Sequence, residues 1–355
     1  MRHTVVVVEV THMQEPPAMN SMTIGLDLAK SVFQVHGVDG VGQVSVKKKL
    51  RRAEVLRFFE ALPPCLVGME ACGTAHHWAR QISALGHEVR LMAPSYVKAY
   101  VRRQKNDAAD AEAICEAVTR PSMRFVPVKS VERQGVLTLH RTRELLVRQR
   151  TMLINAIRGH CAEFGVVTSQ GARRVNELIE TTRQADPSVL PDEARFALLA
   201  LGEQLEVLAA RIHGLDLRLL AWHRQDAASQ RLATIPGVGV ITATALSAAV
   251  TDPALFRSGR EFAAFLGLVP RQTSSGGKAR LGRISKMGDG YLRKLLVVGA
   301  TSIVRRARTG AFAAAPWLRG LLERKPARVA TVAMANKTAR IVWAVLAREE
   351  VYRPA

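Results

Sequence analysis

The sequence predicts an α/β domain followed by an all-α region in one chain of 355 residues. Short apolar runs between residues 22 and 93, separated by Gly- and Pro-containing breaks, predict strands that alternate with helices. Further along, leucines spaced three and four residues apart over Leu198–Trp222 predict a long helix with one apolar seam. The length allows two or three domains, and the hydrophobic content of 48% is typical of folded proteins.

The chain is strongly basic, with a formal net charge of +21 at pH 7. Such an excess of Lys and Arg indicates a polyanionic partner, most simply nucleic acid. A membrane surface is the alternative, but no apolar run reaches the roughly 18 residues of a spanning helix, so we expect no membrane partner. The cysteines show neither zinc-ligand nor disulfide-framework spacing, which predicts reduced thiols in a cytoplasmic protein; they are Cys65, Cys72, Cys115 and Cys161.

The first domain is expected to begin with three antiparallel strands joined by Gly-containing turns, over Met22–Ala29, Ser31–Val38 and Val41–Lys49. A helical pattern over Arg51–Leu62 then ends at two prolines. After it come an apolar strand, a helix and a further strand, over Cys65–Met69, Thr74–Leu85 and Glu88–Met92. Three strands followed by alternating helix and strand is the order of a ribonuclease-H-like fold.

Four acidic residues stand at the ends of these elements. Asp27 and Glu70 end two of the buried strands, while Asp107 and Asp110 lie three apart at the start of a helical stretch and so share one face. Carboxylates gathered in this way repel one another unless a cation lies between them, and oxygen ligands suit Mg²⁺ or Mn²⁺. A pair of such ions supports phosphodiester chemistry.

Other interpretations of these residues stay open. Asp27 and Glu70 could be ordinary strand-end acids, and Asp107 and Asp110 could favour a helix N-terminus through its dipole. A basic stretch lies just before them, at Arg102, Arg103 and Lys105. It is either a solvated surface or a set of phosphate contacts that lead nucleic acid to the carboxylates.

The middle of the chain is expected to be helical. Val131–Phe164 has leucines seven residues apart, and the heptad seam of the second helix lasts over three heptads. Pro187 and Pro191 separate the two helices. We expect an antiparallel helical hairpin or an intermolecular coiled coil that makes a homo-oligomer, with packing inside the monomer as the simpler alternative.

The composition changes from Ala233. The segment Ile235-Pro236-Gly237-Val238-Gly239, followed by Thr242–Leu246, resembles a helix-hairpin-helix motif. Gly237 and Gly239 would let backbone N–H groups approach a phosphate at a helix N-terminus. The alternative is a Gly-rich helix turn that binds no DNA.

A short helix over Phe262–Pro270 leads to a Gly- and Ser-rich basic stretch over Arg271–Lys286. We expect this stretch to be a flexible loop lying against a phosphate backbone. Its candidate nucleic-acid contacts are Arg271, Lys278, Arg280, Arg283 and Lys286. Two further helices are expected, one from Tyr291 and one over Val329–Leu346.

The order of these motifs closely resembles the insertion-sequence transposases with a DEDD motif, the IS-one-ten family and its IS-eleven-eleven branch. The resemblance covers residues 22 to 325, from the four acids through Pro-Gly-Val-Gly and Phe-Leu-Gly-Leu-Val-Pro-Arg to Ser-Ser-Gly-Gly-Lys and Gly-Arg-Ile-Ser-Lys. It implies a RuvC-like domain at 22–128, a coiled-coil region at 129–228 and a C-terminal transposase domain at 229–325. Outside the resemblance, residues 1–21 contain Pro16-Pro17 and little periodicity and are expected to be an extension, and residues 326–355 are expected to form a terminal helix and tail.

The resemblance also implies an activity. Such proteins resemble recombinases that excise and insert a mobile element, guided by a noncoding bridge RNA that pairs with donor and target DNA, in the bacterial cytoplasm with the nucleoid. The RuvC-like acids would bind Mg²⁺, and a serine would attack the DNA phosphate and be joined to it transiently. By motif that serine is Ser275, with Ser274 as the second choice. The rival functions are a Holliday-junction endonuclease that needs no serine and a nonenzymatic nucleic-acid-binding protein.

Overall fold

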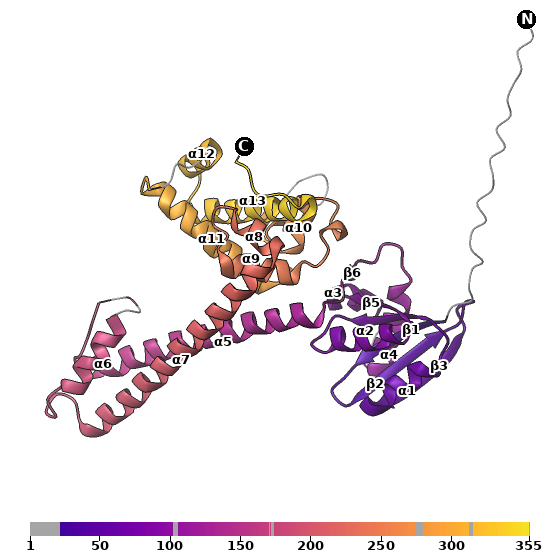
Figure 1. Cartoon of the computed structure of the whole chain (residues 1–355), viewed down its shortest axis with the longest axis horizontal. Helices are drawn as coiled ribbons and strands as arrows, with labels where there is room; N and C mark the ends of the chain where they lie inside the picture. The colour runs from indigo at the N-terminus through magenta and orange to yellow at the C-terminus, as the bar shows by residue number, and fades with distance from the viewer. Residues whose placement is uncertain are drawn as a thin grey trace, which may run out of the picture. The chain divides into compact units, whose positions relative to one another are not determined.

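The computed structural model describes residues 22–101, 106–169, 171, 174–273, 280–311 and 315–354. The chain divides into two compact units between Lys129 and Ser130 (Figure 1). The first unit is an α/β domain, and the described residues of the second are helical apart from one short hairpin of strands. This confirms the predicted combination of an α/β domain with an all-α region.

The first unit is built on a mixed sheet of order β3-β2-β1-β4-β5-β6. Strands β1 (Thr23–Leu28), β2 (Val32–Val38) and β3 (Val44–Arg51) are antiparallel, as predicted. Strands β4 (Leu66–Glu70) and β5 (Glu88–Met92) run parallel to β1, and β6 (Phe125–Val126) is antiparallel to β5. The helices are η1 (Arg52–Glu54), α1 (Val55–Glu60), α2 (Ala75–Ala84), α3 (Pro94–Val97), η2 (Lys98–Tyr100) and α4 (Asp107–Val118).

The two faces of this sheet differ because side chains alternate along a strand. On one face Ile24, Leu26, Val67 and Met69 are fully buried in a core shared with α1 and α2. The other face carries the alternate residues of the same strands and packs against α4. The candidate acids lie on this second face.

In the second unit, α5 (Val131–Glu163) and α7 (Asp192–Gln225) form a long antiparallel pair, with α6 (Arg174–Gln184) packed at one end (Figure 1). The start of α5 meets the end of α7 around Val136 and Leu219, and the end of α5 meets the start of α7 around Ile157 and Leu198. The heptad leucines Leu205 and Leu208 are buried in the monomer. The expected hairpin is therefore present, and an intermolecular coiled coil stays a prediction.

The rest of this unit forms a helical core. It comprises α8 (Ala227–Ala233), α9 (Val240–Ala249), η3 (Pro253–Leu255), α10 (Gly259–Phe265), α11 (Gly290–Arg308), α12 (Pro316–Arg324) and α13 (Ala327–Arg348). Among the described helices, α13 alone has the length and composition to cross a membrane. It buries Ala335, Ala339 and Val342 in the core and carries Lys337 and Arg340 at its middle, as a core helix of a globular domain does.

A buried polar network joins three helices of this core. His140 on α5 is fully buried and hydrogen-bonds through Nδ1 to Tyr291 Oη (3.0 Å) and through Nε2 to Thr244 Oγ1 (3.0 Å). Burial lowers the pKa of His140 to about 4, with the nearby Arg143 acting in the same direction and Asp216 opposing. The imidazole is therefore neutral at physiological pH.

The expectation of a flexible loop over Arg271–Lys286 was wrong for part of its length. Strands β7 (Pro270–Gln272) and β8 (Leu281–Ile284) pair as an antiparallel hairpin. The Gly and Ser content of the stretch obscured two strands of three and four residues, which are too short for a clear alternating pattern. Residues 274–279 between them lie outside the described residues.

The four cysteines are free thiols, as predicted. Cys65, Cys115 and Cys161 are buried, and burial raises the pKa of both the Cys65 and the Cys115 thiol to about 11. Such thiols stay protonated and unreactive at physiological pH.

Candidate active site

Two of the predicted acids lie side by side at the carboxyl ends of β1 and β4. These strands are parallel and paired in register up to Leu26 and Met69, so Asp27 and Glu70 occupy equivalent positions one residue further on. Both acids are partly buried. They share the sheet face of Gly25 and Gly68, which come two residues earlier on each strand and are paired with each other.

The glycine pair lets α4 lie directly on the sheet. A Cβ atom at Gly25 would stand 2.1 Å from the Ala111 carbonyl oxygen and 2.4 Å from the Cys115 nitrogen. A Cβ atom at Gly68 would meet the Val118 side chain at 2.8 Å. Only glycine allows this close approach, so these two residues fix the distance between helix and sheet.

The start of α4 carries the other two acids. Asp107 precedes Ala111 and Cys115 at spacings of four residues, so it continues the stripe of the helix that faces β1. Asn106 caps the helix, and its Oδ1 accepts a hydrogen bond from the Ala109 N–H (2.9 Å). The capped first turn thus brings Asp107 and Asp110 to the end of β1 where Asp27 lies.

Three of the four predicted acids meet there. One carboxylate oxygen each from Asp27, Asp107 and Asp110 lies within 4.8 Å of the other two. Glu70 is not part of this group of described residues. Two oxygens bound to the same ion at ~2.1–2.4 Å are at most about 4.2–4.8 Å apart, so the three carboxylates fit a hard divalent cation. Asp27 and Asp110 are partly buried and Asp107 is exposed. Carboxylates this close repel one another, and a bound cation would remove that repulsion.

The neighbouring strands extend this face with polar residues that sequence patterns did not point out. Gln34 and His36 on β2 pair in register with Asp27 and Gly25, and Lys49 and Lys47 on β3 pair with these two β2 residues. His36 is 5% exposed, and its Nδ1 has no hydrogen-bond partner among the described residues. Burial lowers the pKa of His36, with Glu112 opposing and Lys47 reinforcing the effect.

The two lysines could have been found in the sequence. They are two residues apart in Val44–Arg51, which is the period of a strand. The pairing of β2 with both β1 and β3 places them on the same sheet face as Asp27. Lys48 points to the opposite face, where its Nζ lies 5.7 Å from the centre of the Phe58 ring. Lys47 and Lys49 thus place positive charge on the sheet face that also carries the acids.

The predicted glycines of the second unit lie in the turn between α8 and α9. Gly237 has φ of +81°, and a Cβ there would come within 2.7 Å of Ile303 Cδ1 on α11. Positive φ and close packing therefore account for this glycine without any ligand. Gly239 has open space around it and precedes the N-terminus of α9. Helices α8 and α9 flank this turn, while a helix-hairpin-helix motif and its contact with DNA stay predictions.

The predicted basic residues divide into two groups. Arg271, Arg280, Arg283 and Lys286 are exposed on or next to the β7–β8 hairpin, and Arg271 Nη2 donates to the Ser285 carbonyl (3.4 Å). The remaining predicted residues lie outside the described part of the chain; they are Arg102, Arg103, Lys105, Lys278 and the serines Ser274 and Ser275.

Comparison with known proteins gives two family matches. A family model described as a transposase, the DEDD model of IS110 type, matches residues 24–165. A second one, described as the transposase IS116/IS110/IS902 family, matches residues 229–315. The first match contains all four acids, and the second contains the α8–α9 turn and the β7–β8 hairpin.

Whole-length relatives agree with these matches. A probable family 20 transposase of Pseudomonas aeruginosa is 54% identical over 95% of this chain and 100% of its own length. The transposase for insertion sequence element IS1111A of Coxiella burnetii is 41% identical over 93% of this chain and 91% of its own. The transposase for element IS1328 of Yersinia enterocolitica is 39% identical over 94% of this chain and 99% of its own.

Proposed function

This chain belongs to the IS110 family of DEDD insertion-sequence transposases, and we propose that it cuts and rejoins DNA with the help of a divalent metal and a serine–DNA intermediate. The observation that supports this most strongly is the meeting of Asp27, Asp107 and Asp110 within 4.8 Å on a ribonuclease-H-like sheet. The three carboxylates come from two separate elements, the end of β1 and the start of α4.

In this proposal Asp27, Asp107 and Asp110 hold Mg²⁺ or Mn²⁺, and Glu70 completes the set from the adjacent strand. When bound, such an ion polarises a phosphate and lowers the pKa of a hydroxyl nearby. The chain's own part is to fix these carboxylates. Gly25 on β1 and Gly68 on β4, against which α4 packs, hold this helix in the required place together with the Asn106 cap.

Ser275 is the proposed nucleophile, and it lies between β7 and β8 in the sequence. Its Oγ would form a bond to phosphorus while the bond from phosphorus to one sugar oxygen breaks, and the serine proton leaves to a base or to water. The released sugar hydroxyl, or that of another strand, then attacks the phosphoserine and restores the hydroxyl. A serine needs activation for this step, because it is a weak nucleophile at its ordinary pKa.

The proposed partners are donor and target DNA and a guide RNA, which would place the protein at the nucleoid. The net charge of +21 supports polyanion binding. The proposed phosphate contacts are Arg271, Lys278, Arg280, Arg283, Lys286, Arg102, Arg103 and Lys105, with Gly237 and Gly239 at the α8–α9 turn. Sequencing the RNA that copurifies from the native locus tests guidance, and only random fragments would count against it.

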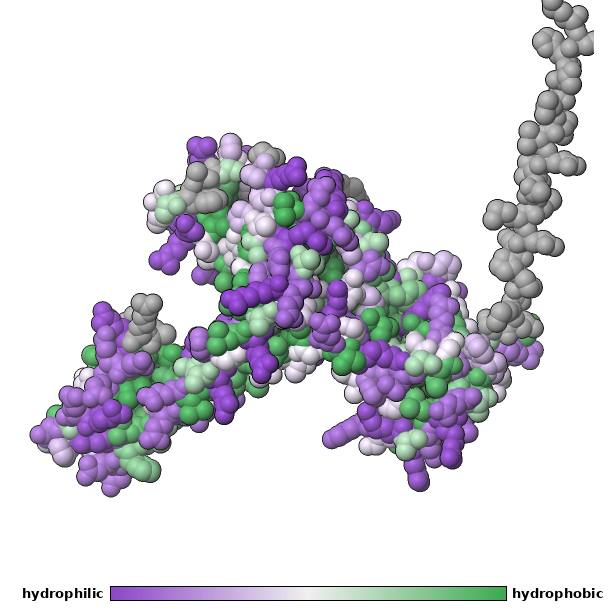
Figure 2. Space-filling model, viewed as in Figure 1, coloured by the Kyte–Doolittle hydropathy of each residue, from purple (hydrophilic) through white to green (hydrophobic). Residues whose placement is uncertain are grey.

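A homo-oligomer, a dimer or a tetramer, is proposed from the α5–α7 pair. Apolar residues remain at its surface in Figure 2, and Leu145 and Met152, seven apart on α5, are 48% and 64% exposed. Association through this surface would allow one protomer to supply the serine and its partner the acids. Mixing Ser275→Ala chains with Asp27→Ala chains tests this arrangement, because activity in the mixture requires sites shared between protomers.

Strand joining at the element ends is the decisive test of the proposed function. We expect Asp27→Asn to abolish cleavage and joining, and Ser275→Ala to abolish both together with the covalent protein–DNA adduct. Ser274→Ala is the matched control and should retain activity. Cleavage that survives in Ser275→Ala would instead favour a Holliday-junction endonuclease, and unchanged function in Asp27→Asn would favour a nonenzymatic binding protein.

A further inference from the structure

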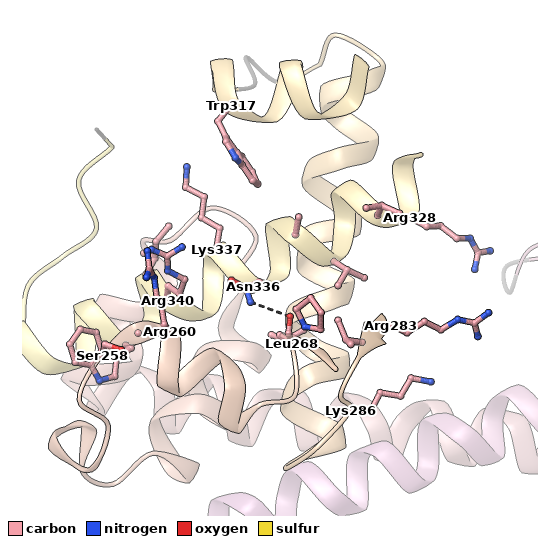
Figure 3. A pocket seen from close by; sticks show the side chains of 18 of the residues that line it. Ser258, Arg260, Leu268, Arg283, Lys286, Trp317, Arg328, Asn336, Lys337 and Arg340 are labelled. Atoms are coloured by element: carbon pink, nitrogen blue, oxygen red, sulfur yellow. Dashed lines mark hydrogen bonds between the residues drawn. The ribbon is translucent and has the colours of Figure 1, made fainter. Parts of the chain in front are cut away.

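The second unit contains a groove of about 1690 Å³ between the β7–β8 hairpin, the start of α10 and one face of α13 (Figure 3). Trp317 of α12 borders it as well. It is formed by segments between Ser258 and Ala344 that meet only in the folded unit. All of its lining residues belong to the second unit, whereas the acidic cluster belongs to the first.

The groove is positively charged. Six exposed cations line it, and none of its described lining residues is acidic. None of the six forms an ion pair with another described residue; they are Arg260, Arg283, Lys286, Arg328, Lys337 and Arg340. Six like charges along one groove repel one another, and an anionic occupant would remove that repulsion.

The charges alternate with apolar surface. On α13, Arg328, Lys337 and Arg340 line the groove together with the apolar Val329 and Ile341. Trp317 is 42% exposed, and Lys337 Nζ lies 4.7 Å from the centre of its ring; Figure 3 shows the indole directed toward Lys337. The groove thus combines anchors for phosphates with an aromatic plane and an aliphatic floor.

This mixture indicates the chemistry of the occupant. A DNA duplex offers phosphates outside and keeps its base faces stacked inside, so it leaves the aliphatic floor and the indole without a partner. An acidic amphipathic helix separates its charges from its apolar stripe. In an unpaired nucleic-acid strand, by contrast, phosphates and exposed base faces alternate along the chain, and proteins bind such strands with cations and aromatic rings together.

We propose that this groove binds an unpaired DNA or RNA strand, with its phosphates on the six cations and a base against Trp317. The inference rests on the proposed function to the extent that the protein handles nucleic acid, and it adds a site for unpaired strands in the second unit. Trp317 selects for exposed bases, and the cations supply affinity without sequence preference.

The test is binding of a fluorescein-labelled 12-nucleotide oligothymidine strand, and of a 12-base-pair duplex, to the full chain. Trp317→Ala should weaken strand binding by about 5- to 150-fold, the range for the loss of one stacked base, and leave duplex binding within about twofold. Trp317→Phe, which keeps an aromatic plane, should restore most of the affinity. Phe196→Ala removes an exposed ring elsewhere in the unit and should change nothing.

A second pair of variants tests the charges. Replacing Arg328 and Lys337 by Gln should reduce the slope of log affinity against log salt by about 0.7 per cation for the strand. The double substitution Arg211→Gln and Arg218→Gln, at exposed positions on α7, is the control and should leave the slope unchanged.

The outcomes separate this inference from the proposed function. Equal losses for strand and duplex, or no loss in Trp317→Ala, would overturn the groove inference, while strand joining by the same preparation would leave the proposed function standing. If Trp317→Ala lost self-association but kept strand binding, the groove would be occupied by a second copy of the chain, and the inference would be wrong. A wild-type protein that binds neither strand nor duplex would refute the proposed function itself.

Discussion

The substitution Gly25→Ala tests how the sheet positions the acids of α4. The added Cβ would stand 2.1 Å from the Ala111 carbonyl oxygen, and ordinary contact begins at 3.4 Å. Both atoms that it meets first belong to the helix backbone, which cannot rotate away. The helix would therefore have to move from the sheet by about 1 Å, a change of the kind that costs about 1–3 kcal/mol.

The size of this movement matters more for the site than for the fold. Mg²⁺ requires its ligands near 2.0–2.1 Å, so a shift of about 1 Å in Asp107 and Asp110 relative to Asp27 removes the fit. We expect Gly25→Ala to fold, with the melting temperature of the first unit lowered by roughly 4–8 °C per kcal/mol. We expect Mn²⁺ to raise the melting temperature of the wild type, and we expect Gly25→Ala to lose this rise.

Two other glycines provide graded controls for the same measurement. Gly68→Ala meets only the side chain of Val118, at 2.8 Å and beyond, and this side chain can adjust, so its effect should be smaller. Gly73→Ala has open space and should behave as the wild type. Equal stability and equal Mn²⁺ response in Gly25→Ala and Gly73→Ala would refute the view that Gly25 positions Asp107 and Asp110.

Three further predictions concern protonation, charge and assembly. Because the pKa of buried His140 is lowered from 6.5 to about 4, the unfolded chain takes up the proton first as pH falls through this window. The free energy of unfolding of the wild type should fall by up to about 3 kcal/mol over this pH window. In His140→Gln, measured by urea unfolding, it should not fall in this way, and a pH dependence as steep as that of the wild type would contradict the assignment. Lys47→Ala with Lys49→Ala should weaken DNA binding and lower its salt slope by about 1 per lysine, whereas Lys48→Ala, on the opposite face, should not. Met152→Glu should shift light scattering toward the monomer if α5 mediates assembly, with exposed Val167→Glu as control, and an unchanged mass would exclude this surface.

Most of the α/β fold could be predicted from the sequence, because the apolar runs that indicate its strands are local patterns. The strands near Asp27 and Glu70 end in clear apolar runs, and β5 has the predicted bounds, Glu88–Met92. The convergence of Asp27 with Asp107 and Asp110 could be expected only from the order of a ribonuclease-H-like fold, since about 80 residues separate the two elements. That Glu70 does not join the group within 4.8 Å depends on side-chain placement, which no sequence pattern encodes.

Other features were missed for different physical reasons. Helix α6 was not expected, although Val175, Leu178, Ile179 and Thr182 follow a helical spacing and are buried. Its signal is only three turns long. The groove beside Trp317 could not be predicted, because its cations come from α10, β8, the segment after β8 and α13, and only tertiary packing brings them together.

The central claim is that Asp27, Asp107 and Asp110 form a divalent-metal site, and Mn²⁺ binding followed by electron paramagnetic resonance tests it most directly. The account predicts saturable Mn²⁺ binding by the wild type, competition by Mg²⁺, and at least tenfold weaker binding in Asp27→Asn and in Asp110→Asn, because each loses a charged ligand from one cluster. Glu60→Gln removes an exposed acid on α1 and should bind as the wild type does. Equal Mn²⁺ affinity in all four proteins would contradict the account.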